Sequence, residues 1–375
     1  MTSNIENIAV NKELPLNSRL KKFKAYGAPL INVNLLMNTN ENPYSLPEKV
    51  VTEILNELAI ELPNLNRYPD RLQIRLKEEI AKYLSRITKL NLTTNQVWAA
   101  NGSNEILNQI LLAFFDPGAK ALGFSPSYSM HKILSEQNGY EFIEIERQED
   151  FSIELNKALN FIKLQNPRII FITSPNNPTG NILELADLEE ILKVARGSVV
   201  VFDEAYGEFS TQPSAIELTL TYPNLIVTRT MSKAFAFAGA RVGYAIAQPE
   251  TLAALGLVRL PYHLSTQTQV LASVALRNHH LLQNQVQQII QDREWMQVEL
   301  KKLGFTALES DANFFLLGRL KSAAEAFEAL VRAYVLVRDV GIPHFLRVTV
   351  PTTEQAHLFV RQVSALLDNK EIELV

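Results

Sequence analysis

The chain has 375 residues, of which 47% are hydrophobic and 20% are charged, and its formal net charge is −4. This length suits about two globular domains, and the slightly acidic balance gives no overall basic surface for nucleic acid. The absence of cysteine excludes disulfides and thiolate metal sites and is compatible with a reducing cytoplasm.

Residues 1–45 are predicted to form an N-terminal arm. The segment is polar, is basic around Lys21, Lys22 and Lys24, and is interrupted by prolines. Such an arm rarely packs alone, so we expect it to lie on the smaller domain and on a partner subunit. Its first 19 residues lack the apolar core of a secretory signal, and no apolar run in the chain approaches the ~20 residues of a membrane helix. We therefore expect a cytoplasmic protein without a membrane contact.

Residues 46–278 are predicted to form a large α/β domain. Helices are expected at residues 47–62, 72–84 and 106–115. Seven strands are expected at residues 96–100, 120–124, 141–146, 168–173, 198–203, 225–230 and 242–247. Continuous apolar runs such as residues 169–172 are typical of strands that are buried on both faces, as in a mainly parallel sheet.

Residues 279–375 are predicted to form a smaller α+β domain. It begins with one long, glutamine-rich helix at residues 279–303. Further helices are expected at residues 322–334 and 354–367, and strands at residues 314–317, 335–338 and 345–350. None of the six histidines forms an HExxH pair, so we expect no metal site.

The strongest polar clusters all follow predicted strands. Ligands of such sheets bind outside the carboxyl ends of the strands, so these clusters mark one candidate site. They are residues 101–104, 125–128, 176–180, 203–206 and 230–233.

Lys233 is the residue around which this site is organised. It follows a buried strand, beside the hydroxyls of Thr230 and Ser232, and Arg241 lies eight positions further on. A neighbouring cation and partial burial both favour the neutral amine, which is the nucleophile for a carbonyl cofactor. Taken alone, the same stretch is equally compatible with a surface lysine.

The other strand-end residues match what a cofactor with an aldehyde, a phosphate and a heteroaromatic ring requires. A buried carboxylate can hold a protonated ring nitrogen, amide and phenol groups can bind a ring oxygen, an aromatic side chain can stack on the ring, and a helix N-terminus with hydroxyls and a guanidinium can bind the phosphate. Each residue also has an ordinary structural explanation, but together they point to pyridoxal 5′-phosphate. The carboxylate for the ring nitrogen is Asp203, the groups for the ring oxygen are Asn177 and Tyr206, and the stacking side chain is Tyr128. The residues for the phosphate are Gly102, Ser103, Asn104, Thr230, Ser232 and Arg241.

Several motifs resemble those of the fold-type-I aminotransferases. SPNNPTG at residues 174–180, VFDEAY at 201–206 and Ser232-Lys233 carry this resemblance. A second set resembles the histidinol-phosphate aminotransferases more narrowly: NTNENPY at 38–44, NRYPD at 66–70, NGSNE at 101–105, RTMSKAFAFAG at 229–239 and SDANF at 310–314. The match runs from about Tyr26 to the last predicted helix.

This resemblance implies roles for individual residues. Lys233 would bind the cofactor covalently and move the substrate proton, assisted by Asp203 and Tyr206. Tyr68 would reach the cofactor phosphate of a neighbouring subunit, so that the active unit would be a homodimer. The substrates would be histidinol phosphate and glutamate or 2-oxoglutarate. Residues at substrate-contacting positions are Tyr26, Asn104, Tyr128, Tyr262, Asn313, Arg338 and Arg347.

Arg347 and Arg338 are candidates for binding different anionic groups of the substrates. A planar guanidinium can bind a carboxylate or a phosphate ester through two hydrogen bonds, which suits Arg347 to both substrates. Arg338 is a candidate for the phosphate, but an ion pair with Asp339 or Glu328 is an equally good interpretation. Pro351 stands where members of the family that this chain resembles usually carry a glycine. The proline removes a backbone N–H near Arg347.

Other functions remain open at this stage. An aromatic amino-acid aminotransferase or a phosphothreonine decarboxylase would share the lysine motif. The first would need no phosphate pocket, and the second would release carbon dioxide without 2-oxoglutarate. A cofactor-binding regulatory domain without turnover is a third alternative.

Overall fold

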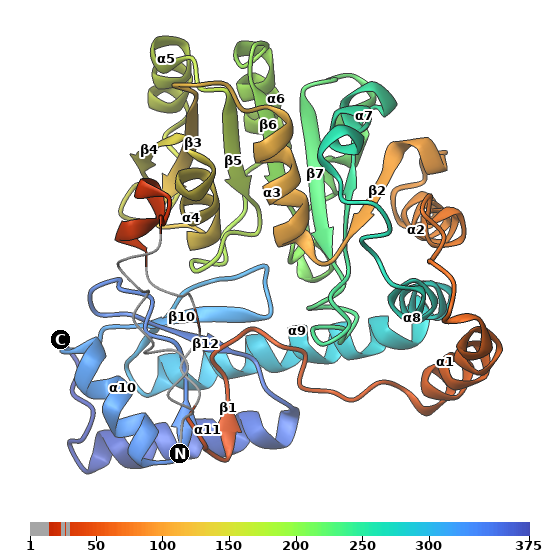
Figure 1. The fold of residues 1–375 in the computed structure, drawn as a ribbon. Helices are drawn as coiled ribbons and strands as arrows, with labels where there is room; N and C mark the ends of the chain where they lie inside the picture. Colours follow the sequence, from red (N-terminus) through yellow and green to blue (C-terminus); the bar gives the residue numbers. More distant parts are fainter. Residues whose placement is uncertain (1–14, 24–26, 28–30) are drawn as a thin grey trace.

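The computed structural model describes residues 15–23, 27 and 31–375. A seven-stranded sheet has the order β2-β8-β7-β6-β5-β3-β4 (Figure 1). Strand β8 is antiparallel to both of its neighbours, and the remaining neighbours are parallel. The predicted mainly parallel α/β sheet is therefore confirmed. The strands are β2 (Val97–Ala100), β3 (Lys120–Ser125), β4 (Glu141–Glu146), β5 (Ile169–Thr173), β6 (Val199–Asp203), β7 (Leu225–Thr230) and β8 (Gly243–Ile246).

Helices cover both faces of this sheet. Alternate residues of β5 and β6 join two different apolar clusters, so these strands are buried on both sides. Helices α3 (Ser103–Ala113) and α7 (Pro249–Val258) pack on one face. Helices α5 (Leu155–Gln165) and α6 (Leu185–Val194) pack on the other. The two-sided burial explains why the strands read as continuous apolar runs.

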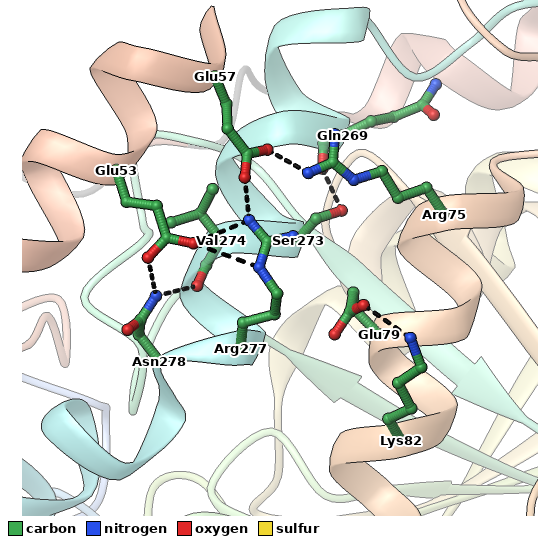
Figure 2. Close-up of polar contacts among 10 residues, drawn as sticks. All are labelled: Glu53, Glu57, Arg75, Glu79, Lys82, Gln269, Ser273, Val274, Arg277 and Asn278. Carbon is green, nitrogen blue, oxygen red and sulfur yellow. Dashed lines mark hydrogen bonds and ion pairs between the residues drawn. The ribbon is translucent and has the colours of Figure 1, made fainter.

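Three helices beside the sheet are joined by charged side chains. They are α1 (Glu48–Glu61), α2 (Ile74–Thr88) and α8 (Thr266–Arg277). Arg277 on α8 pairs with Glu53 at 3.0 Å and with Glu57, and Glu57 also pairs with Arg75 on α2 (Figure 2). Asn278 donates to Glu53 at 2.7 Å. We call these five residues the interhelical cluster.

A second group of elements follows α8. Helix α9 (His279–Lys302) runs beneath the large sheet in Figure 1 and leads to an antiparallel sheet of order β12-β10-β9. The predicted boundary at residues 278/279 falls between α8 and α9, and the division into domains stays a prediction. The other elements are β9 (Thr306–Ala307), β10 (Phe314–Gly318), α10 (Ala323–Arg332), β11 (Val335–Leu336), β12 (Leu346–Thr349) and α11 (Thr353–Asp368).

The described part of the N-terminal arm contacts both groups of elements. Arg19 donates to the Asn138 carbonyl at 3.2 Å, and Lys22 pairs with Glu136 at 3.0 Å, both on α4 (Ser129–Asn138). Strand β1 (Leu35–Leu36) pairs in parallel with β11. No helix in the described part of the chain combines the length and apolarity needed to cross a membrane.

Candidate active site

A cavity of about 440 Å³ lies at the carboxyl ends of β5, β6 and β7, and we call it the Lys233 cavity. It brings together most of the residues that the sequence singled out. Both the cofactor set and the two arginines of the substrate set contribute. The predicted residues that line it are Ser103, Asn104, Tyr128, Asn177, Asp203, Tyr206, Thr230, Ser232, Lys233, Arg241, Arg338 and Arg347.

Lys233 enters the cavity from the turn that follows β7. Its Nζ donates a hydrogen bond to the Thr39 carbonyl at 2.9 Å. Burial and the nearby Arg347 and Arg241 guanidiniums, opposed by Glu41, lower the pKa of the amine to about 8. A substantial fraction of this lysine is therefore neutral, and nucleophilic, near physiological pH.

A ring of donors lies at one end of the cavity. The Thr230 and Ser232 hydroxyls are 2.9 Å apart, and Arg241 Nη1 lies 3.4 Å from the Ser232 oxygen. The N-terminus of α3 begins beside them at Ser103, preceded by Gly102 with φ +82°. A Cβ atom at Gly102 would lie 2.7 Å from Arg241 Nη2, so glycine lets the guanidinium approach the helix. Helix N–H groups, hydroxyls and a guanidinium together form a site suited to a phosphate.

Asp203 lies at another wall of the cavity, at the end of β6. Only 1% of its surface is exposed, and its Oδ2 lies 3.3 Å from His131 Nε2. His131 stacks on Phe171, with ring centroids 4.6 Å apart. The sequence patterns do not single out His131, and the one signal that they offer is its position one helical turn after Tyr128. A buried carboxylate held by a histidine is fixed in position to bind a protonated ring nitrogen.

The loop at residues 38–41 closes the cavity from the N-terminal side. Asn40 Nδ2 donates to the Tyr206 hydroxyl at 2.9 Å. Arg347 donates to Asn177 Oδ1 and to the Asn38 carbonyl, each at 2.6 Å. The sequence patterns imply no individual role for residues 38–41, although the NTNENPY motif contains them. The loop joins the strand-end residues to Arg347 of the smaller sheet.

Arg338 and Arg347 are held side by side by two backbone hydrogen bonds of 2.9 and 3.0 Å. No carboxylate among the described residues lies within 4.0 Å of the Arg338 guanidinium, so neither Asp339 nor Glu328 forms the alternative ion pair. Both arginines also line an adjoining cavity of about 410 Å³, together with Tyr128 and Asn177. The Tyr128 hydroxyl donates to Asn104 at 3.1 Å. The adjoining cavity therefore extends the space around the two guanidiniums beyond the Lys233 cavity.

Five predicted residues are not among those that line the Lys233 cavity, and one of them, Gly102, directly precedes the lining residue Ser103 at the N-terminus of α3. Tyr68 is 79% exposed and stacks on Tyr262, with ring centroids 4.4 Å apart. Asn313 is fully buried and donates to the Asn40 carbonyl at 3.1 Å, so here it supports the loop that closes the cavity. Tyr26 lies outside the described residues. Their predicted contacts with substrate or cofactor stay predictions.

Comparisons with known proteins identify what this chain is similar to. The model of the family "Aminotransferase class I and II" matches residues 33–363. A histidinol-phosphate aminotransferase of Nocardia farcinica is 48% identical over 96% of this chain and 93% of its own. One of Corynebacterium efficiens is 46% identical over 93% and 94%. The solved structure of a histidinol-phosphate aminotransferase from Sinorhizobium meliloti, in complex with pyridoxal 5′-phosphate, has a TM-score of 0.81 at 20% identity and covers 90% of this chain and 92% of its own.

Proposed function

The chain belongs to the class I and II aminotransferases and, within them, to the histidinol-phosphate aminotransferase family, and from this premise we propose its reaction. It transfers an amino group between L-histidinol phosphate and 2-oxoglutarate, giving imidazole acetol phosphate and glutamate, in L-histidine biosynthesis. Relatives that carry this name are 46% and 48% identical over nearly the whole chain. The observation that carries the proposal is the convergence of Lys233, Asp203 and Arg347 on one cavity.

Pyridoxal 5′-phosphate fits the chemistry of the residues that line this cavity. When bound, it supplies an aldehyde that accepts the amino group and a ring that stores electron density. Ser103, Thr230, Ser232 and Arg241 would hold its phosphate. Asp203 would hold the ring nitrogen, Asn177 and Tyr206 the ring oxygen, and Tyr128 the ring face.

Lys233 performs two tasks in this proposal. Its amine would hold the cofactor through the aldehyde, and once the substrate amine had taken its place, the same amine would remove the proton from the substrate Cα. A pKa near 8 suits both tasks, since the neutral amine is the base and its protonated form is the acid. Asp203 is buried beside His131 and would keep the ring nitrogen protonated.

Arg347 and Arg338 account for the use of two different substrates in one site. Glutamate presents an α-carboxylate, whereas histidinol phosphate presents a phosphate ester, and a guanidinium can bind either one through two hydrogen bonds. Arg347 is oriented by Asn177 and Asn38, and Arg338 lies beside it without a carboxylate partner in the described part of the chain. We assign the carboxylate to Arg347 and the second oxyanion to Arg338.

The direct test is a half-reaction followed by absorbance. The purified protein with its yellow cofactor is mixed with histidinol phosphate, and separately with histidinol and with phenylalanine. We expect rapid bleaching by histidinol phosphate and at least about 10²-fold slower bleaching by the other two, because they lack the phosphate. Equal bleaching by phenylalanine would instead assign the enzyme to aromatic amino acids. Release of carbon dioxide from phosphothreonine, in a separate assay without 2-oxoglutarate, would assign it to the decarboxylases.

We also propose that the enzyme is a homodimer in which Tyr68 reaches the cofactor phosphate of the partner subunit. Exposed apolar side chains occur on α1 and close to Tyr68 and its stacking partner Tyr262 in the sequence, namely Leu55 (61% exposed), Ile60 (70%), Leu72 (50%) and Leu260 (72%). Large apolar side chains left exposed in one subunit are compatible with burial against another. The test has two measurements, the molar mass in solution and the cofactor retention of Tyr68→Phe. The variant should bind the cofactor about tenfold more weakly, because one hydrogen bond to a charged group is lost. A monomer with full activity would exclude the proposal.

The domain division into residues 1–45, 46–278 and 279–375 stays part of this proposal, as does a cytoplasmic location. The change of sheet at α9 supports the second boundary. The biosynthetic reaction supports the location, which fractionation of cells that produce the protein would test.

A further inference from the structure

Asn40 is the centre of a buried hydrogen-bond network at the wall of the Lys233 cavity. Only 1% of its surface is exposed, and its backbone has φ +54°, a left-handed conformation that asparagine adopts more readily than most residues. Its amide contacts Thr349 of β12 through the oxygen and Tyr206 through the nitrogen, and both of these residues are also buried. The side chain therefore links the smaller sheet to the turn that follows β6.

Thr349 determines which end of the Asn40 amide faces Tyr206. The Asn40 N–H donates to Thr349 Oγ1 at 3.1 Å, and the hydroxyl in turn donates its own proton to Asn40 Oδ1 at 2.9 Å. Turning the amide over would replace this acceptor with a second donor, so that the hydroxyl proton would lose its partner. The amide nitrogen is therefore the end that faces Tyr206.

Residues at the start of β10 hold both partners of the Asn40–Tyr206 hydrogen bond. Asn313 is fully buried, and its Nδ2 donates to the Asn40 carbonyl at 3.1 Å. The adjacent Phe314 contacts the Tyr206 ring edge to face, with ring centroids 5.0 Å apart. The geometry of the pair is thus fixed by packing and by hydrogen bonds within the protein, which is the condition for a preorganised site.

This network assigns a hydrogen-bond role to the Tyr206 hydroxyl. Because the Asn40 amide nitrogen can only donate, the phenol oxygen accepts its hydrogen bond, at 2.9 Å. The phenol proton then points away from Asn40, and Tyr206 lines the Lys233 cavity. A hydroxyl that accepts one hydrogen bond is a stronger donor in the next, since hydrogen bonds in a chain polarise one another. Tyr206 is thereby prepared to donate to an anionic oxygen.

We propose that Asn40 is a positioning residue that makes Tyr206 a hydrogen-bond donor to the ring oxygen of the bound cofactor. This inference rests on the proposed function, in which Tyr206 holds that oxygen. A donor stabilises the oxygen as an anion and so disfavours a proton on the neighbouring nitrogen that joins the cofactor to Lys233. Asn40 therefore lowers the pH at which the bound cofactor loses this proton.

The test is a pH titration of the purified protein with its cofactor, followed by absorbance in the absence of substrate. Asn40→Asp has nearly the shape of asparagine and keeps the oxygen that Thr349 binds, but it replaces the donor NH2 with an acceptor. The Tyr206 proton then turns toward residue 40 and away from the cofactor. We expect the midpoint pH of the absorbance change to rise by at least about 1 unit, a tenfold change in proton affinity, because one hydrogen bond to a charged oxygen is lost.

Asn40→Gly is the second variant, because glycine adds no charge and suits the positive φ at this position. It removes the amide, so the Tyr206 hydroxyl is no longer oriented by residue 40. The midpoint pH should rise by about 0.5 unit, a threefold change in proton affinity, since the lost hydrogen bond is between neutral groups. This variant keeps the test decisive if Asn40→Asp does not fold.

Both substitutions are repeated in Tyr206→Phe, which has no hydroxyl to orient. Asn40→Gly should shift the midpoint there by less than about 0.2 unit, and Asn40→Asp by no more than about half of its shift in the wild type, the remainder being the effect of its charge. Asn224→Ala is the control outside the cavity, because this amide donates to the Ala195 and Ser198 carbonyls at 2.9 and 3.1 Å. It should leave the midpoint unchanged.

The outcomes separate this inference from the proposed reaction. Equal shifts of the midpoint in the two backgrounds, or no shift in either, would refute the role of Asn40. A wild-type protein that bound no chromophore would refute the proposed cofactor and this role together. Since no substrate is present, a different substrate specificity would not affect the result.

Discussion

Two regions of this molecule use charged side chains in opposite ways. In the interhelical cluster, Arg75 and Arg277 each face a carboxylate (Figure 2). In the Lys233 cavity, no carboxylate of the described chain lies within 4.0 Å of the Lys233, Arg241 or Arg338 side-chain nitrogens. Paired charges hold elements together, whereas cations gathered without such partners favour an anionic ligand.

The two regions also shift pKa values for different reasons. Partial burial alone would raise the pKa of Glu53, but hydrogen bonds from Asn278 and Arg277 and the charge of Arg277 lower it. The pKa of Lys233 is lowered by burial and by like charges. Glu53 is thus stabilised in its charged form, while Lys233 is destabilised in its charged form. The comparison predicts that changes in the cavity mainly affect reaction and that changes in the cluster mainly affect stability.

The largest expected effect is that of Lys233→Ala. The half-reaction with histidinol phosphate should slow by at least about 10³-fold, because both the amine nucleophile and the base are lost. Stopped-flow absorbance measures this rate. Lys193→Ala, on the exposed face of α6, is the control and should leave the rate within about twofold. A retained cofactor band of unchanged position in Lys233→Ala would remove the catalytic assignment.

Arg347→Lys should have the next largest effect on the reaction. The ammonium group cannot replace a planar guanidinium that binds an oxyanion through two hydrogen bonds, so kcat/KM should fall about 10²-fold. Arg332→Lys changes an arginine that pairs with Glu371 in an exposed position, and steady-state kinetics of this control should match the wild type. If the two variants behaved alike, Arg347 would not contact the substrate.

Lys233→Met in the cofactor-free protein tests how much the protonated Lys233 side chain lowers the free energy of unfolding. The folded pKa of about 8 lies below the unfolded value, so protonated Lys233 costs stability at pH 7, and this cost disappears as the pH rises from about 8 toward 10.5. The variant should therefore be more stable by about 1–3 kcal/mol at pH 7, and by much less at pH 10. Urea unfolding at the two pH values measures the difference. If the variant were less stable than wild type at pH 7, protonated Lys233 would not destabilise the folded protein.

Arg277→Met should have the smallest effect, and this effect should be on stability and not on the reaction rate. The variant leaves Glu53 and Glu57 without their shared cation, but these side chains are partly exposed, so the loss should be about 1 kcal/mol. Chemical denaturation measures it, and 1 M salt should reduce it. The half-reaction rate should stay within about twofold of wild type. A large loss of rate with unchanged stability would show that the cluster acts on the site.

Strand ends carried most of the predictive information for the site. Asp203, Lys233 and Asn177 were identified because parallel strands bring their carboxyl ends to one edge of the sheet. His131 was not identified, because its contact with Asp203 depends on where the packing of the elements brings α4 relative to the end of β6, and no local pattern encodes that. The same holds for Asn40, which lies far from Tyr206 in the sequence and 2.9 Å from it in space.

The sequence by itself determined the seven-stranded α/β fold, the lysine at the end of β7 and the family, because periodicity and short motifs are local properties of the chain. Only the tertiary structure decided that Arg338 lacks an ion pair with Asp339 or Glu328, that Asn313 supports a loop, and that Asn40 links Thr349 to Tyr206. Those facts depend on distances between residues that are remote in sequence, and a side chain's partners and burial are fixed only when the elements pack.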